Sequence, residues 1–117
     1  MKTRENILNL KNKEFIFTCL DMLKSKCRAD YLSVLTNPDE SKRRFDMNFS
    51  ILQEVSSIGS ISKEHFMDTS GHRRYYPDTF SDAGRRFIVC NDWYYNTKSN
   101  KRDTRTEFVN WVFRSIQ

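Results

Sequence analysis

Apolar residues near the start of the chain recur at the spacing of a helix. Between positions 13 and 27 they follow the pattern i, i+3, i+4, i+7, i+11 and are Ile16, Cys19, Leu20, Leu23 and Cys27. This spacing gathers their side chains on one face of a helix. It predicts an amphipathic helix over residues 13–27 with Asn12 as its N-cap. The apolar residues that follow favour a shorter helix over 29–35.

A further helix start is marked by the sequence Asn37-Pro38-Asp39-Glu40. Asn is a favoured N-cap, Pro is favoured at the first helical position, and acidic residues interact well with the positive end of the helix dipole. The apolar residues after this start are Phe45, Phe49, Leu52 and Val55. Their helical spacing predicts one helix over residues 38–55.

The chain changes character after Gly59, where the pattern predicts a hairpin. A short helical turn is expected at 62–67. Two β-like runs, 73–80 and 85–90, then flank a Gly-containing loop at 81–84, and this arrangement is typical of a hairpin. Pro77 lacks a backbone N–H, so we expect its strand to lie at an edge of the sheet or to be interrupted at this residue.

The last segment predicts a C-terminal helix. Thr104 and Glu107 have the spacing of a capping box, and apolar residues on one face continue the pattern over 104–116. The predicted fold class is therefore α+β, with helices packed on a small antiparallel sheet that is centred on the hairpin at 73–90. We expect one domain over residues 1–117, because no linker or repeat divides the chain.

Composition supports a folded domain and excludes several classes. The three Gly and two Pro among 117 residues exclude a collagen-like or low-complexity chain, and 14% aromatic residues exceed what disordered segments carry. No apolar run is long enough for a membrane span, and the first residues lack the apolar stretch of a secretory signal. We therefore expect a cytoplasmic protein that does not contact a membrane.

The cysteines and histidines do not predict a metal site. Cys19, Cys27 and Cys90 form no C-x-x-C motif, and buried free thiols are the interpretation that we favour. His65 and His72 do not stand at the spacing of zinc ligands relative to these cysteines. The sequence therefore predicts neither a metal nor a cofactor.

Positive charge is concentrated in one part of the chain. Residues 1–70 hold 11 basic and 10 acidic groups, residues 71–105 hold 8 and 4, and residues 106–117 hold one of each. Seven of the 16 aromatic residues also lie in 71–105. Arginine and lysine neutralise phosphates, and exposed tyrosine or tryptophan rings stack on unpaired bases. The segment 71–105 is therefore a candidate nucleic-acid-binding surface.

This hypothesis favours DNA over RNA and names eleven residues, with an acidic protein surface as the alternative partner. The candidate residues are Arg73, Arg74, Tyr75, Arg85, Arg86, Trp93, Tyr94, Lys98, Lys101, Arg102 and Arg105. A secondary basic face at Lys42, Arg43 and Arg44 is either a solvated helix face or a phosphate contact. In the competing interpretation, the rings pack the core and the arginines pair locally. Asp78, Asp82 and Asp92 are then the carboxylates nearest in sequence.

The order of helices and hairpin also fits a winged-helix module. The hairpin at 73–90 would be the wing, and 62–69 or 38–55 would supply the recognition helix. The further C-terminal helix is not required by this arrangement.

A protein-interaction or accessory domain, part of a bacterial or phage defence or regulatory assembly, is the second hypothesis. It rests on the run Trp93-Tyr94-Tyr95, because neighbours on a strand alternate faces and cannot all point inward. In the alternative, the final helix covers this run and Trp111 packs against Trp93.

A metal-dependent nuclease is the third hypothesis, with Asp78 and Asp92 as candidate ligands. The acid-x-Lys element expected on the next strand is missing, because Trp93 and Tyr94 follow Asp92. No nucleophile elbow or Gly-rich phosphate loop occurs in the sequence. A non-enzymatic role is therefore favoured over an enzyme.

Overall fold

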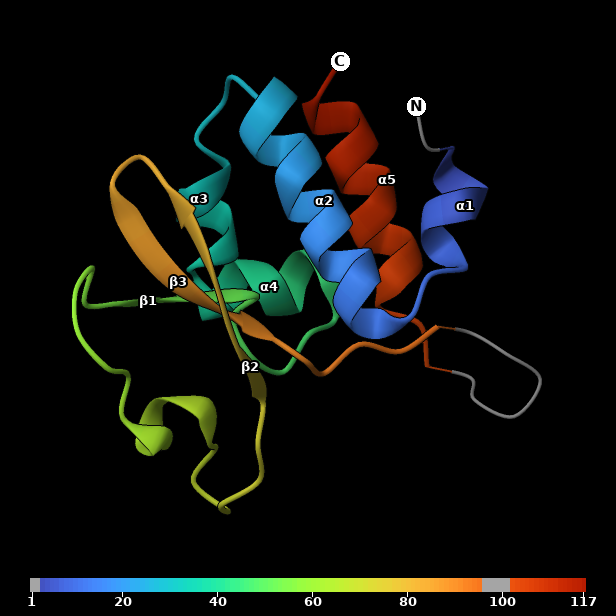
Figure 1. The fold of residues 1–117 in the computed structure, drawn as a ribbon. Coiled ribbons are helices and arrows are strands. Elements are labelled where there is room, and N and C mark those ends of the chain that lie inside the picture. Colours follow the sequence, from blue (N-terminus) through green and yellow to red (C-terminus); the bar gives the residue numbers. More distant parts are fainter. Residues whose placement is uncertain (1–2, 96–101) are drawn as a thin grey trace.

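The computed structural model describes residues 3–95 and 102–117, in which helices and a small sheet enclose one apolar core (Figure 1). The predicted α+β class is confirmed. The elements in chain order are α1 (Arg4–Leu8), α2 (Asn12–Lys26), α3 (Tyr31–Leu35), α4 (Pro38–Phe45), β1 (Leu52–Val55), η1 (Lys63–Phe66), β2 (Tyr75–Asp82), β3 (Arg85–Cys90) and α5 (Arg105–Ser115).

The sheet has three antiparallel strands in the order β1-β3-β2. The central strand β3 is buried from Phe87 to Cys90, as the run of apolar residues predicted. β2 lies at an edge, and its pairing with β3 shifts register between Tyr75 and Thr79. Pro77 stands in this interval, where it removes a ladder donor. The predicted edge position of this strand is thus confirmed.

Helices α1, α2 and α5 lie next to one another above the sheet in the view of Figure 1. The predicted apolar stripe of α2 faces inward, since Ile16, Cys19, Leu20 and Leu23 are buried. Phe108 of α5 makes ring contacts to Phe15 of α2 and to Phe45 of α4, with centroids 6.1 and 5.2 Å apart. This aromatic cluster joins three helices that are distant in sequence.

The predicted helix over 38–55 is wrong beyond Phe45. Asp46 adopts a left-handed backbone with φ of 57°, which ends α4. The residues Leu52–Val55 then form β1 and pair with β3. Two of the four apolar residues that suggested a helix, Leu52 and Val55, therefore belong to a strand. The pairing of this segment as a strand follows from the burial of β3. A buried central strand needs hydrogen-bond partners for its backbone groups along both edges, and β1 supplies them along one edge.

Helix boundaries shift by a few residues elsewhere. The short helix α1 was not predicted; it begins with a capping box between Thr3 and Asn6. Lys11, not Asn12, is the N-cap of α2. The predicted capping box of the last helix is also wrong, since the Thr104 side chain makes no capping bond. Asp103 performs this role instead by accepting a hydrogen bond from the Thr106 N–H at 2.9 Å.

Both segments that were predicted to supply the recognition helix of a winged-helix module form shorter helical elements in the structure. The segment 62–69 contains one turn of 3-10 helix at Lys63–Phe66, and 38–55 is split into a helix and a strand. The hairpin also belongs to a sheet with a third strand. The two candidate recognition elements are therefore reduced to a single 3-10 turn and to the eight-residue helix α4.

The connection between β1 and β2, residues 56–74, forms a lobe that we call the connector lobe; it extends below the sheet in Figure 1. Phe66 is its buried anchor, and its backbone carbonyl accepts from the Arg74 N–H at 2.8 Å. Asp68 accepts hydrogen bonds from the N–H groups of Ser70 and His72 at 2.8 and 3.0 Å.

Nothing in the described ranges forms a helix that is long and apolar enough to cross a membrane.

Candidate nucleic-acid interface

Three of the nine predicted site residues that the structure describes are buried. Tyr75, Trp93 and Arg105 are exposed by 5%, 4% and 5%. The Tyr75 hydroxyl donates to the Ser50 carbonyl oxygen at 2.8 Å, and burial raises the pKa of this phenol to about 12. Side chains in such positions stabilise the fold and present no surface to a ligand.

Arg105 is the first residue of α5, and its side chain extends to the turn between α1 and α2. Its Nη2 group donates to the carbonyl oxygens of Leu8 and Leu10 at 2.9 and 2.6 Å and lies 3.3 Å from that of Ile7. Its Nη1 group donates to Asn12 Oδ1 at 3.2 Å. Burial lowers the pKa of this guanidinium. The side chain therefore satisfies backbone acceptors that would otherwise lack a donor.

The aromatic run 93–95 is covered to different degrees. The Trp93 ring lies 5.4 Å from Phe15 and 5.0 Å from Phe108, and its indole N–H donates to the Cys90 carbonyl at 2.8 Å. The final helix thus covers Trp93, as the alternative proposed, but the covering ring belongs to Phe108 and not to Trp111. Tyr94 and Tyr95 are half-buried. The run therefore offers a weaker protein-binding surface than the sequence suggested.

Two of the predicted arginines form ion pairs. Arg85 binds both Glu54 carboxylate oxygens, at 2.7 and 3.1 Å. Arg74 donates to Asp68 Oδ2 at 2.9 Å and lies 3.5 Å from Asp92 Oδ1. Hydrogen bonds from Arg85 and Arg74 lower the pKa of Glu54 and of Asp68. Local pairing was the competing interpretation, and it holds for these two guanidinium groups.

The acids expected to neutralise the arginines have mostly other partners. Asp92 contacts Arg74, as expected. Asp78 instead binds Lys13 of α2, and Asp82 accepts a hydrogen bond from the Tyr31 hydroxyl of α3. The partners Glu54 and Asp68 could not be predicted, because both lie outside the hairpin in sequence and are brought to it by β1 and by the connector lobe.

Arg73 and Arg86 carry charge that no carboxylate neutralises within the described ranges. Arg73 is exposed, and its guanidinium lies over the Phe66 ring, 5.3 Å from the centroid. Arg86 donates to the carbonyl oxygens of Ser56 and Gly59 at 2.7 and 2.9 Å. Ring faces and carbonyls orient a guanidinium without removing its net charge. These two residues are the predicted cations that remain available to an anion.

Three further predicted cations follow Tyr95 in the chain. Lys98 and Lys101 are outside the described residues. Arg102 donates to the Asp46 carbonyl at 3.0 Å and lies 4.6 Å from the centroid of the Tyr94 ring. The described members of the predicted set are therefore divided between the core, the region beside Tyr94, and the surface around the hairpin and the connector lobe.

The secondary basic face on α4 is accompanied by acids. Lys42 binds Asp46 at 2.7 Å, and Arg43 and Arg44 bind Glu40 at 2.5 and 2.8 Å. Exposed pairs of this kind contribute little stability but reduce the local positive field. The solvated-face interpretation therefore fits α4 better than a phosphate contact.

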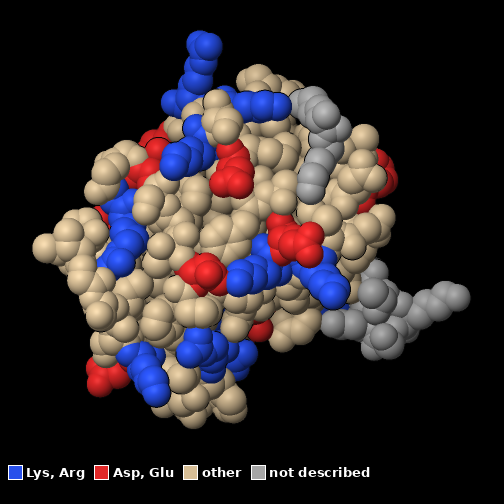
Figure 2. Space-filling model, viewed as in Figure 1, with Lys and Arg blue, Asp and Glu red and all other residues tan. Residues whose placement is uncertain are grey.

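The connector lobe gathers further basic groups. It contains Lys63, Arg73 and Arg74 against Glu64 and Asp68, as well as two exposed histidines. In Figure 2 basic side chains lie at the lower end of the molecule, where the lobe lies, with an acidic group beside them and further basic groups elsewhere on this face. Because Asp68 is engaged by Arg74, Lys63 and Arg73 remain against the exposed Glu64, and the lobe keeps an excess of positive charge. Sequence reasoning missed Lys63, which lies just before the segment with the largest charge excess.

Asp78 and Asp92 do not form a metal centre together. Asp78 is exposed on β2 and paired with Lys13, whereas Asp92 is buried beside Arg74 and accepts from the Tyr94 hydroxyl at 3.1 Å. Within the described part of the chain, no group of three His, Cys, Asp or Glu residues is placed to hold a metal ion. The nuclease hypothesis gains no support from this geometry.

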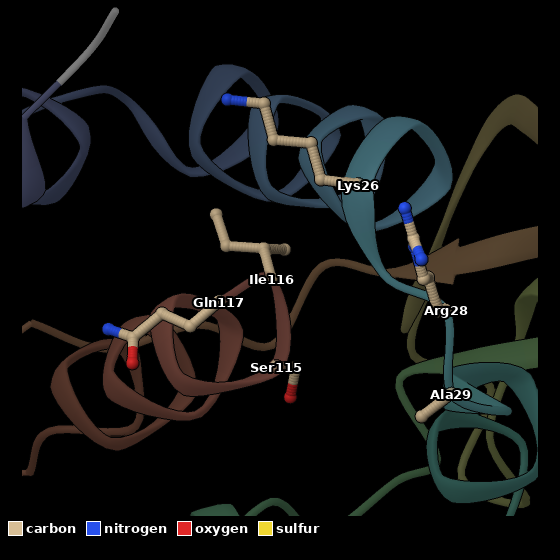
Figure 3. A pocket seen from close by; sticks show the side chains of 6 residues that line it. All are labelled: Lys26, Arg28, Ala29, Ser115, Ile116 and Gln117. Carbon is tan, nitrogen blue, oxygen red and sulfur yellow. The ribbon is translucent and has the colours of Figure 1, made fainter.

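A cavity of about 490 Å³ lies between the C-terminal ends of α2 and α5 (Figure 3). Its walls are formed by Lys26, Arg28, Ala29, Ser115, Ile116 and Gln117. None of the predicted site residues is among them. The cavity is therefore separate from the connector lobe and from the hairpin.

Comparisons with known proteins add no family to this description. No protein-family model, no curated protein sequence and no solved structure matches the chain. Function must therefore be inferred from the site geometry.

Proposed function

We propose that this chain is a nucleic-acid-binding module that contacts DNA, in preference to RNA, through the connector lobe and the adjoining part of β3. The observation that carries the proposal is the exposed guanidinium of Arg73, which lies on the Phe66 ring with no carboxylate partner in the described ranges. Lys63 and Arg86 extend the positive surface. An exposed cation held in place by a ring is well suited to a phosphate contact.

The phosphate backbone is the part of DNA that this surface addresses. Each neutralised phosphate releases condensed counterions, so affinity depends on salt concentration. For contacts from Lys63, Arg73 and Arg86, raising the salt concentration fourfold is expected to weaken binding roughly 40-fold. The described surface offers no recognition helix for base edges, so we expect weak dependence on base sequence.

Fluorescence anisotropy across a salt series tests the proposal. Labelled duplex DNA, single-stranded DNA and single-stranded RNA are titrated with the full chain. The double variant Lys63→Gln/Arg73→Gln lacks two basic side chains of the lobe, so the slope of log affinity against log salt should fall by about two. Arg114→Gln removes an exposed charge from α5, far from the lobe, and serves as the matched control.

Two results would contradict the proposal. One is the absence of binding to all three nucleic acids at low salt. The other is an equal loss of affinity and slope in the control Arg114→Gln, which would show that net charge, and not the connector lobe, governs the interaction.

A further inference from the structure

The start of the connector lobe presents an aliphatic side chain to solvent. Ile58 is 80% exposed, and it is the only large hydrophobic residue in the described ranges that stands so far out of the surface. It lies in the segment 56–60, which we call the Ile58 loop. Isolated exposed apolar residues are common, so the exposure becomes informative only through the way the loop is held.

Arg86 holds the Ile58 loop from below. Its Nε group donates to the Ser56 carbonyl at 2.7 Å, and its Nη2 group donates to the Gly59 carbonyl at 2.9 Å and lies 3.5 Å from that of Ile58. Ser56 Oγ accepts from the Ile58 N–H at 3.4 Å. The loop is therefore bound on both sides of Ile58, and a side chain on a preorganised loop loses less entropy on binding.

Gly59 completes this geometry. Its φ of +83° is a conformation that residues with a side chain rarely adopt, and the space around its missing Cβ is open. Glycine is therefore required for the turn of the backbone and not for close packing. The turn directs the chain back towards Arg86 and leaves Ile58 at the outside of the loop.

Positive charge lies at the base of the exposed side chain. The partners of Arg86 are carbonyl groups, which leave its net charge in place, whereas the neighbouring Glu54 is already bound by Arg85. An apolar tip above a cationic base matches a ligand with apolar surface between rows of negative charge. DNA has this character, because stacked bases lie between two phosphate backbones.

We propose that Ile58 is a wedge that enters between adjacent base pairs of DNA while Arg86 lies near the flanking phosphates. This proposal rests on the nucleic-acid-binding function proposed above. A single aliphatic side chain suffices to open a base step and kink the duplex. A stable protein interface, by contrast, needs a cluster of apolar anchors over a wide area, and within the described ranges Ile58 has no such neighbours at comparable exposure.

Bending and base unstacking test the wedge separately from binding. A duplex with a central TA step, which unstacks easily, carries a donor and an acceptor dye at its ends, and a second duplex carries 2-aminopurine beside the step. The wild-type chain should raise both the energy transfer and the 2-aminopurine fluorescence. Ile58→Ala should lose both signals yet keep the same salt slope in anisotropy. Ser57→Ala, a change in the same loop, is the control and should behave as the wild type.

The outcomes separate the two proposals. Wild-type binding without bending, or equal bending by Ile58→Ala, overturns the wedge and leaves the binding function in place. No binding by the wild type overturns both. Because Ile58 is exposed, its replacement should leave the thermal unfolding midpoint unchanged, and this measurement confirms that any lost signal is not caused by unfolding.

Discussion

The guanidinium carbon of Arg105 lies 4.1 Å from the centroid of the Phe15 ring. The same side chain reaches the carbonyl groups that connect α1 to α2. An arginine at the start of the last helix therefore holds the first two helices in position. This arrangement places a positive charge among aromatic rings, where cation–π attraction and hydrogen bonds offset part of its desolvation.

Replacing Arg105 is expected to destabilise the fold. Arg105→Ala removes the donors to the carbonyls of Leu8 and Leu10 and leaves a void beside Phe15. Buried acceptors without partners cost about 1–3 kcal/mol each, so the free energy of unfolding should fall by about 3 kcal/mol or more. Urea denaturation measures this loss.

Binding measurements on Arg105→Gln distinguish this structural role from a phosphate contact. The glutamine removes the charge and the planar fork of donors, so stability should fall, whereas the salt dependence of DNA binding by the folded protein should stay unchanged because the buried guanidinium neutralises no phosphate. A variant as stable as the wild type, with a smaller salt slope, would return Arg105 to the interface.

Arg105 illustrates which part of the candidate site could be predicted from sequence. The excess of basic residues in 71–105 could be counted in the sequence, but the position of each basic side chain, in the core or on the surface, could not be predicted. The acceptors of Arg105 are backbone carbonyls of residues 7–10, and no residue-type pattern reports them. Arg73 and Arg86 have no carboxylate partner in the described part of the chain, because the elements around them supply a ring and carbonyls instead of acids.

The fold was predictable where a pattern had one interpretation. The stripe of α2 and the apolar run of β3 led directly to their elements. Leu52 and Val55 stand three residues apart, which fits a helix. The four residues of this segment are too few, however, to distinguish the 3.6-residue period of a helix from the two-residue period of a strand. In the sequence, the low helix propensity of Asn48 and Ser50 was the available signal that α4 ends early. The left-handed backbone of Asp46 is visible only in the structure.

The three cysteines should differ sharply in reactivity. Burial raises the pKa of Cys19 and of Cys90 to about 12, whereas Cys27 is half-buried at the end of α2. A shift from 9.0 to about 12 leaves roughly a thousandfold less thiolate at neutral pH. A thiol reagent should therefore label Cys27 quickly and the other two only at the rate of unfolding.

Mass spectrometry of labelled peptides measures these rates. Cys27→Ser should abolish the fast phase, and urea should make the remaining thiols react together. Native-state labelling of Cys19 or Cys90 at the rate of Cys27 would show that the core is more open than the packing indicates.

Acid should loosen the connector lobe through Asp68. The hydrogen bond from Arg74, with those from the backbone of His72 and Ser70, holds the pKa of this carboxyl below its ordinary value of 3.8. A lowered folded-state pKa stabilises the protein above the unfolded value, and this stabilisation is lost as the pH falls through the folded value. The protection factors of lobe amides in hydrogen exchange should therefore fall in that acidic range.

Two variants test the assignment to this ion pair. Asp68→Asn removes the titrating group and should flatten the pH dependence of lobe exchange. Arg74→Gln removes the largest cause of the shift and should move the acid transition to higher pH. An unchanged profile in Asp68→Asn would assign the transition to another carboxylate.

The tip of the hairpin offers a stabilising substitution. Ala83 and Gly84 form a two-residue turn with φ of +54° and +73°, and such turns favour Asn-Gly because both residues need positive φ. Alanine in this conformation costs about 1 kcal/mol, so Ala83→Asn should raise the unfolding midpoint by about 4 °C. Gly84→Ala should lower it by a similar amount, and strain alone would be responsible, because the space around the added Cβ is open. Differential scanning calorimetry checks both shifts. A lower midpoint for Ala83→Asn, or an unchanged one for Gly84→Ala, would show that the turn does not hold this backbone conformation in solution.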